Sequence, residues 1–164
     1  MRTLAAFIAF ALLATSLYAK DAFDLLATES LGKIKMGLPA AAVVKALGEP
    51  EKKGTEQKEE ATGDWTQDWS YSAQGLKLTM SSAKKGGAKT VSTITATGAC
   101  KLTTARGIKI GSSLADLRKA YANVESKDDS QPGKTFVAGS IYGGVIFTLK
   151  GDKVSQIFVG AAAE

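Results

Sequence analysis

The chain has 164 residues, 45% hydrophobic and 23% charged, an ordinary balance for one compact domain or two small halves that share a core. Its 21 basic residues outnumber its 16 acidic residues, but they form no dense basic stripe, and this argues against nucleic-acid binding. The absence of histidine excludes Ser-His-Asp and Cys-His nucleophilic systems and histidine-based zinc sites.

The N-terminus has the pattern of a secretory signal peptide. Arg2 supplies a positive charge, residues 4–14 form an unbroken apolar run, and small or neutral residues follow as far as Ala19. The run is shorter than the roughly 20 residues that a membrane-spanning helix needs. We therefore predict a signal peptide over residues 1–19 and a periplasmic or secreted mature protein with no stable membrane span. A retained N-terminal anchor helix is the alternative.

Three blocks of the sequence occur twice in the same order. Residues 34–39 match 108–113, residues 75–80 match 144–149, and residues 91–94 match 154–157. The offset between copies changes only at loops, where insertions are tolerated. We therefore predict two tandem repeats, at residues 20–98 and 99–164.

Each repeat is expected to begin with a helix. Apolar residues recur at helical spacing after Pro39 and after Ser113, which are expected at the helix starts, and Ser112 is a candidate cap for the second helix. Gly48, followed by Pro50, is expected to end the first helix.

The remaining blocks of each repeat alternate apolar and polar residues, which is typical of strands. The residues expected to face the core are Leu76, Leu78, Met80, Ile94, Ala96, Val145, Phe147, Leu149, Ile157 and Val159. The polar runs at residues 51–64 and 125–134 are expected to be solvated loops. The predicted fold is α+β, with two tandem helix-plus-three-strand repeats that form an antiparallel sheet and pack their helices on one face.

Groups that could support chemistry are few. The acidic residues Glu59, Glu60, Asp64 and Asp68 lack the spacing of a glycosidase pair or a calcium loop. We predict no catalytic residues, no cofactor and no metal. Cys100 has no partner for an internal disulfide, so we expect a buried thiol, with an intermolecular disulfide as the alternative.

A partner-binding surface is the more promising site. By the same alternation, Ile146 and Phe158 face away from the core, and Trp69 and Tyr71 share one face of an earlier strand. These four residues are the candidate partner-binding residues, because exposed apolar patches with aromatic anchors often mark interfaces. For Trp69 and Tyr71 the alternative is that they fill the core, as large aromatic residues usually do.

Each repeat has Ile-x-apolar-Gly before its helix, and the first helix ends at Leu47-Gly48. Strands that begin with Gly and the motif Val-x-x-Ile follow. This pattern resembles tandem-repeat proteins of the β-lactamase-inhibitor-protein type. A single unit also resembles the small outer-membrane-assembly lipoproteins. The resemblance covers residues 31–160. It implies an exported, non-enzymatic protein, and in the inhibitor type the sheet face away from the helices binds a partner protein.

From these observations we expect an exported, non-enzymatic binding protein. Its open sheet face would engage another envelope or secreted protein, in the manner of an inhibitor or an assembly factor. The alternative is a periplasmic protein that binds a small ligand between the two repeats. A hydrolase that uses the acidic loops is a third hypothesis.

Overall fold

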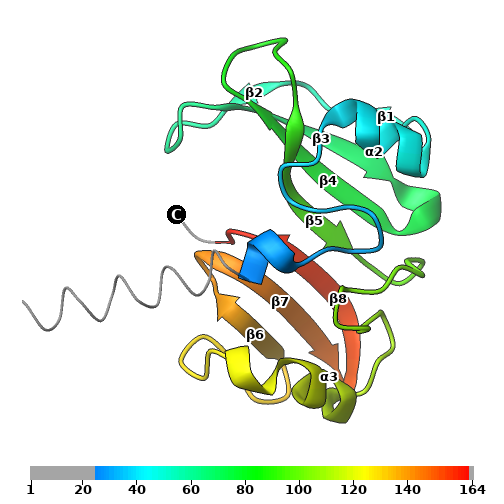
Figure 1. The fold of residues 1–164 in the computed structure, drawn as a ribbon, viewed down its shortest axis with the longest axis vertical. Coiled ribbons are helices and arrows are strands. Elements are labelled where there is room, and N and C mark those ends of the chain that lie inside the picture. Colours follow the sequence, from blue (N-terminus) through cyan, green and yellow to red (C-terminus); the bar gives the residue numbers. More distant parts are fainter. Residues whose placement is uncertain (1–24, 163–164) are drawn as a thin grey trace, which may run out of the picture.

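The computed structural model describes residues 25–162, and its main feature is one antiparallel sheet of eight strands (Figure 1). The strands are β1 (Lys52–Lys53), β2 (Gln57–Lys58), β3 (Trp65–Tyr71), β4 (Leu76–Ser82), β5 (Thr90–Ala96), β6 (Thr135–Ser140), β7 (Gly143–Lys150) and β8 (Lys153–Gly160). Their order is β1-β3-β4-β5-β8-β7-β6, and β2 also pairs with β3. β5 and β8 therefore join strands from the two halves of the chain into one sheet. The predicted signal peptide lies outside the described residues.

The helices of the described residues are short. They are α2 (Ala40–Leu47), α3 (Leu114–Tyr121), the 3-10 helices η1 (Ser72–Gln74) and η2 (Ala122–Val124), and a helical turn at residues 25–28. Pro39 and Gly48 flank α2, as predicted. Ser113 rather than Ser112 caps α3, because its Oγ accepts the N–H of Asp116 at 3.1 Å. Within residues 25–162 no helix is long and apolar enough to cross a membrane.

The predicted fold class, two helix-plus-three-strand repeats with helices packed on one face, is wrong. The structure is mostly an antiparallel sheet with few short helices. The polar run at residues 51–64, predicted as a loop, contributes β1 and β2, which pair with backbone groups along the outer side of β3. α2 and α3 bury only Val43, Leu117 and Tyr121. Buried loop residues complete the core beside them, namely Leu31, Ile34, Cys100 and Ile108.

The core lies against one face of the sheet. All ten strand residues that the alternation assigned to the core are buried there, which confirms the predicted orientation of these strands. Phe147 is the aromatic centre of one end, with its ring 5.0 Å from that of Tyr121 and 6.2 Å from that of Phe136. These tilted ring pairs add to the stability gained from burial alone.

A serine marks a register shift in each long hairpin. The shift between β4 and β5 falls at Thr79, whose carbonyl accepts the Ser92 hydroxyl at 3.0 Å. The shift between β7 and β8 falls at Thr148, whose carbonyl accepts the Ser155 hydroxyl at 3.1 Å. Each bulge adds one residue to its strand and shifts the alternation there. Val91 and Ile94 are therefore both buried although they are three positions apart, and so are Val154 and Ile157.

Candidate functional site

The face of the sheet opposite the core is only partly exposed and carries the residues between the buried positions. We call it the open face. A row of directly opposed residues crosses it through four strands, in the order Lys77, Thr95, Phe158 and Ile146. Thr95, Phe158 and Ile146 are half-buried and Lys77 is exposed. The structure thus brings together two of the four candidate partner-binding residues, Ile146 and Phe158, as a cross-strand pair.

Polar groups surround this apolar pair. Gln156 and Thr148, which oppose each other in the register, lie two residues along the same strands and are half-buried. On the far side, Lys77 forms a 2.7 Å ion pair with Asp68, and both side chains are about half exposed. Such an exposed pair adds little to stability. The arrangement is a small apolar spot with a polar rim, as at the centre of many interfaces.

Val137 extends the apolar row, and the sequence reasoning missed it. It lies opposite Ile146 on β6, yet it is buried and stands apart from the main core. The segment before β6 covers it: the carbonyl of Val137 accepts the N–H of Ser126, and its N–H donates to Ser130 Oγ at 2.9 Å. Alternation along β6 was the available signal, because Val137 lies between Phe136 and Ala138, which both face the core.

Trp69 and Tyr71 lie in the core, so the structure does not bring them to the open face. Trp69 is 4% exposed and donates its indole N–H to Gln67 Oε1 at 2.9 Å. Tyr71 is 1% exposed and donates its hydroxyl to the carbonyl of Gly48 at 3.1 Å. Burial and the nearby Glu49 charge raise the pKa of Tyr71. Both residues face the core because β3 pairs them with the buried Leu78 and Leu76.

Within the described residues, short segments pair along the outer sides of the long outer strands β3 and β6. β1 and β2 pair along the outer side of β3. At the other edge, residues 125–131 form bridges and hydrogen bonds to β6. Because an exposed edge is what an added strand needs, the open face offers more room to a partner than the edges do.

The acidic residues of the loops do not converge. Glu59 and Asp64 meet through backbone atoms only, with the Glu59 N–H donating to the Asp64 carbonyl. Asp129 accepts the Ser126 hydroxyl at 2.9 Å within its own loop. Among residues 25–162 no group of three acidic or cysteine side chains is arranged to hold a metal ion. Cys100 is 3% exposed, and burial raises the pKa of its thiol.

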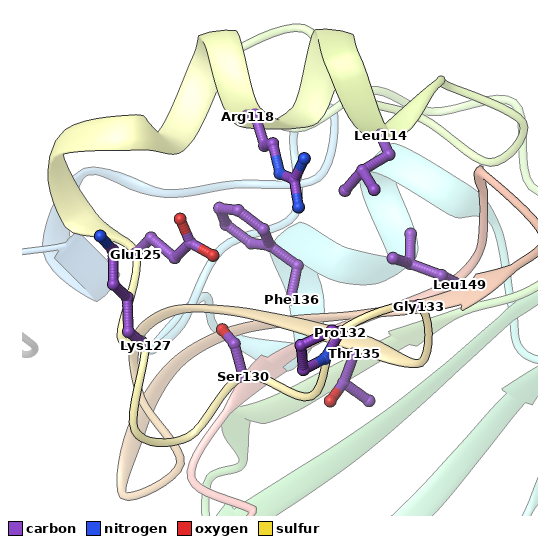
Figure 2. A pocket seen from close by; sticks show the side chains of 10 residues that line it. All are labelled: Leu114, Arg118, Glu125, Lys127, Ser130, Pro132, Gly133, Thr135, Phe136 and Leu149. Atoms are coloured by element: carbon purple, nitrogen blue, oxygen red, sulfur yellow. The ribbon is translucent and has the colours of Figure 1, made fainter.

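A pocket of about 390 Å³ opens between α3 and the segment before β6 (Figure 2). The apolar side chains of Leu114, Phe136 and Leu149 line it, together with charged side chains of Arg118, Glu125 and Lys127. In Figure 2, Arg118 points from α3 toward the Phe136 ring. All lining residues lie between positions 114 and 149. The pocket is therefore not at the predicted junction of residues 20–98 and 99–164.

Comparisons with protein-family models, with curated proteins and with solved structures found no match to this chain. The resemblance to the inhibitor-type proteins therefore stays a prediction from the residues.

Proposed function

We propose that this chain is an exported, non-enzymatic binding protein that engages another envelope or secreted protein through the open face of its sheet. The observation that carries the proposal is the cross-strand pair of Ile146 and Phe158, half-buried apolar side chains ringed by threonine, glutamine and lysine. An apolar centre with a polar rim favours a protein partner. The short segments that pair along β3 and β6 favour the face as the contact surface.

Two features of the sequence support the rest of the proposal. The apolar run at residues 4–14 favours export to the periplasm or the medium. The lack of histidine and the scattered acidic residues favour binding over catalysis. An inhibitor-like or assembly-factor-like role is the form of binding that the resemblance suggests.

The test is affinity capture from an envelope extract with three forms of the mature protein, followed by mass spectrometry. Phe158→Ala removes the aromatic side chain of the pair. Tyr142→Ala is the matched control, since it also removes an aromatic side chain but lies in the turn between β6 and β7 and is 63% exposed. We expect a protein that the wild type and Tyr142→Ala retain and that Phe158→Ala loses.

Thermal melting of each variant separates a lost contact from a lost fold. Phe158 is only half-buried, so we expect its replacement to cost about 0.5–1 kcal/mol through the lost cross-strand pair with Ile146. Equal capture by the wild type and Phe158→Ala would count against the open face as the binding surface.

A further inference from the structure

The pocket under α3 has an apolar base and a charged rim. Phe136 and Leu149 are buried strand residues at its base, and Leu114 adds an apolar side chain from the start of α3. A volume of about 390 Å³ is near the lower end of the range typical of small-molecule sites. The shape therefore suits a compact ligand with an apolar body.

The cations of this rim form no ion pair with the residues that the structure describes. Arg118 and Lys127 form no ion pair or side-chain hydrogen bond with any residue in 25–162. Arg106, by contrast, donates to the Ala120 carbonyl and stacks on the Tyr121 ring. A guanidinium offers two parallel N–H donors that match a carboxylate. Arg118 is thus available for an anionic group seated over Phe136.

Glu125 limits the charge of such a ligand. Its side chain lines the same pocket and forms no ion pair with the residues that the structure describes. A second negative charge near Glu125 would be repelled. The rim therefore favours a single carboxylate at the Arg118 side.

The wall of the pocket is held by its own hydrogen bonds. Gln131 and Thr135 exchange backbone hydrogen bonds of 3.0 and 2.9 Å, and the Leu149 N–H donates to the Lys134 carbonyl at 2.7 Å. Ser130 Oγ accepts the N–H of Val137. A wall fixed in this way spares a ligand the cost of ordering it.

We propose that this pocket binds a small monocarboxylate with a compact apolar body, its carboxylate on Arg118 and its apolar part on Phe136 and Leu114. The site is distinct from the open face and does not depend on the function proposed for that face.

Isothermal titration with 3-phenylpropionate and its neutral isostere 3-phenylpropionamide tests the proposal. We expect the acid to bind about tenfold more tightly than the amide, because only the acid gains charge-assisted hydrogen bonds from Arg118. Arg118→Gln should remove this preference. Lys119→Gln is the matched control, since it makes the same charge change at the next, exposed position of α3 and does not line the pocket.

Amide chemical shifts check the position of the ligand and should move at Thr135 and Phe136. Phe158→Ala should bind the acid as the wild type does, because Phe158 lies on the open face and does not line the pocket. Equal affinity for acid and amide, a preference that persists in Arg118→Gln, shifts confined to other regions, or no binding at millimolar concentration would each overturn the proposal.

Discussion

The Tyr121 hydroxyl donates a 2.8 Å hydrogen bond to Glu29 Oε2, and both side chains are buried. The other carboxylate oxygen of Glu29 accepts the N–H of Ser30 and, at 2.8 Å, the N–H of Ala105. Arg106 Nε lies 3.9 Å from Glu29, and its guanidinium stacks on the Tyr121 ring. A buried carboxylate persists only when it is bonded in this way. The hydrogen bonds of Glu29 therefore link the residues that follow the helical turn at 25–28 to the end of α3.

Tyr121→Phe should destabilise the protein by about 1–3 kcal/mol. The substitution keeps the ring against Phe147 but leaves Glu29 Oε2 without its hydroxyl donor in a buried site. Urea denaturation followed by circular dichroism measures the loss. Tyr142→Phe is the control, because Tyr142 is 63% exposed, and it should melt as the wild type does. Equal unfolding free energies for the wild type and Tyr121→Phe would show that the hydroxyl bond contributes nothing.

The same tyrosine makes stability fall at alkaline pH. Burial is the largest cause that raises the pKa of Tyr121 above its ordinary value of 10.0, and the Glu29 charge raises it further. Above pH 10 the unfolded chain therefore releases a proton that the folded chain keeps, so the unfolding free energy declines as pH rises, by up to about 1.4 kcal/mol per pH unit. The contribution of the protonated Tyr121 to the unfolding free energy is fully present below pH 10.

Urea titrations at pH 9, 10 and 11 compare the wild type with Tyr121→Phe. The variant should decline less steeply, although the raised pKa of the buried Tyr71 keeps part of the effect in both proteins. The two proteins differ in no other ionisable group, so the difference between their slopes reports the Tyr121 proton. Parallel declines would contradict a role for the Tyr121 proton.

Glu56→Gln should loosen the hairpin between β4 and β5. The Glu56 carboxylate pairs with Lys89 and accepts the Gly86 N–H at 2.8 Å, and these contacts, led by the Lys89 hydrogen bond, lower its pKa. We expect lower hydrogen-exchange protection at Gly86 in the variant. Glu60→Gln, an exposed change in the same polar run, is the control.

The pH dependence of this link has a definite sign. Because the folded pKa of Glu56 is lowered, the link is fully present above the ordinary value of 4.5 and is lost as pH falls through the lower folded value. The Gly86 protection factor of the wild type should then fall toward that of Glu56→Gln in acid. A difference between the two proteins that stays constant from pH 6 to pH 3 would contradict the carboxylate's role.

Features that depend on neighbours in the sequence were predictable. The burial of Leu78 and Phe147 follows from alternation alone, and the structure confirms it. The repeated Ile-Lys-x-Gly marks the same turn in both halves of the chain, where the Gly37 N–H donates to the Val91 carbonyl and the Gly111 N–H to the Val154 carbonyl, both at 2.8 Å. Both glycines have positive φ angles, 73° and 87°, which other residues rarely adopt.

Features set by long-range pairing were not predictable. β1 and β2 are polar and exposed, so no burial pattern predicts them. They form strands because their backbone groups pair with those on the outer side of β3. The shared face of Trp69 and Tyr71 was read correctly, but which side it takes depends on their register with β4. The pocket arises where α3 meets the loop before β6, a contact that no sequence spacing reveals.

Cys100 should be unreactive in the native protein. Its side chain is buried, and burial, the largest cause, raises the pKa of the thiol, so little thiolate is available at neutral pH. Labelling with a thiol reagent should be slow in buffer and fast in urea. Mass spectrometry without reductant should show a free thiol and no covalent dimer. A covalent dimer under these conditions would favour the intermolecular disulfide instead.

Gly75 offers a test of the packing around that thiol. A Cβ at Gly75 would lie 2.4 Å from the backbone nitrogen of Cys100 and 2.9 Å from the Thr97 carbonyl oxygen, whereas one at Gly37 would meet nothing within 4 Å. Both residues have positive φ angles, 64° and 73°, so Gly37→Ala should cost only the left-handed backbone term of about 1–2 kcal/mol.

Gly75→Ala carries the same backbone term and must also displace the chain at Cys100, since backbone atoms cannot move aside as a flexible side chain can. We therefore expect a larger loss of unfolding free energy in Gly75→Ala than in Gly37→Ala, together with faster thiol labelling of Cys100 in the native state. Equal losses in the two variants, with unchanged labelling, would show that the turn at residues 97–100 yields without cost and that Gly75 is needed for its backbone conformation alone.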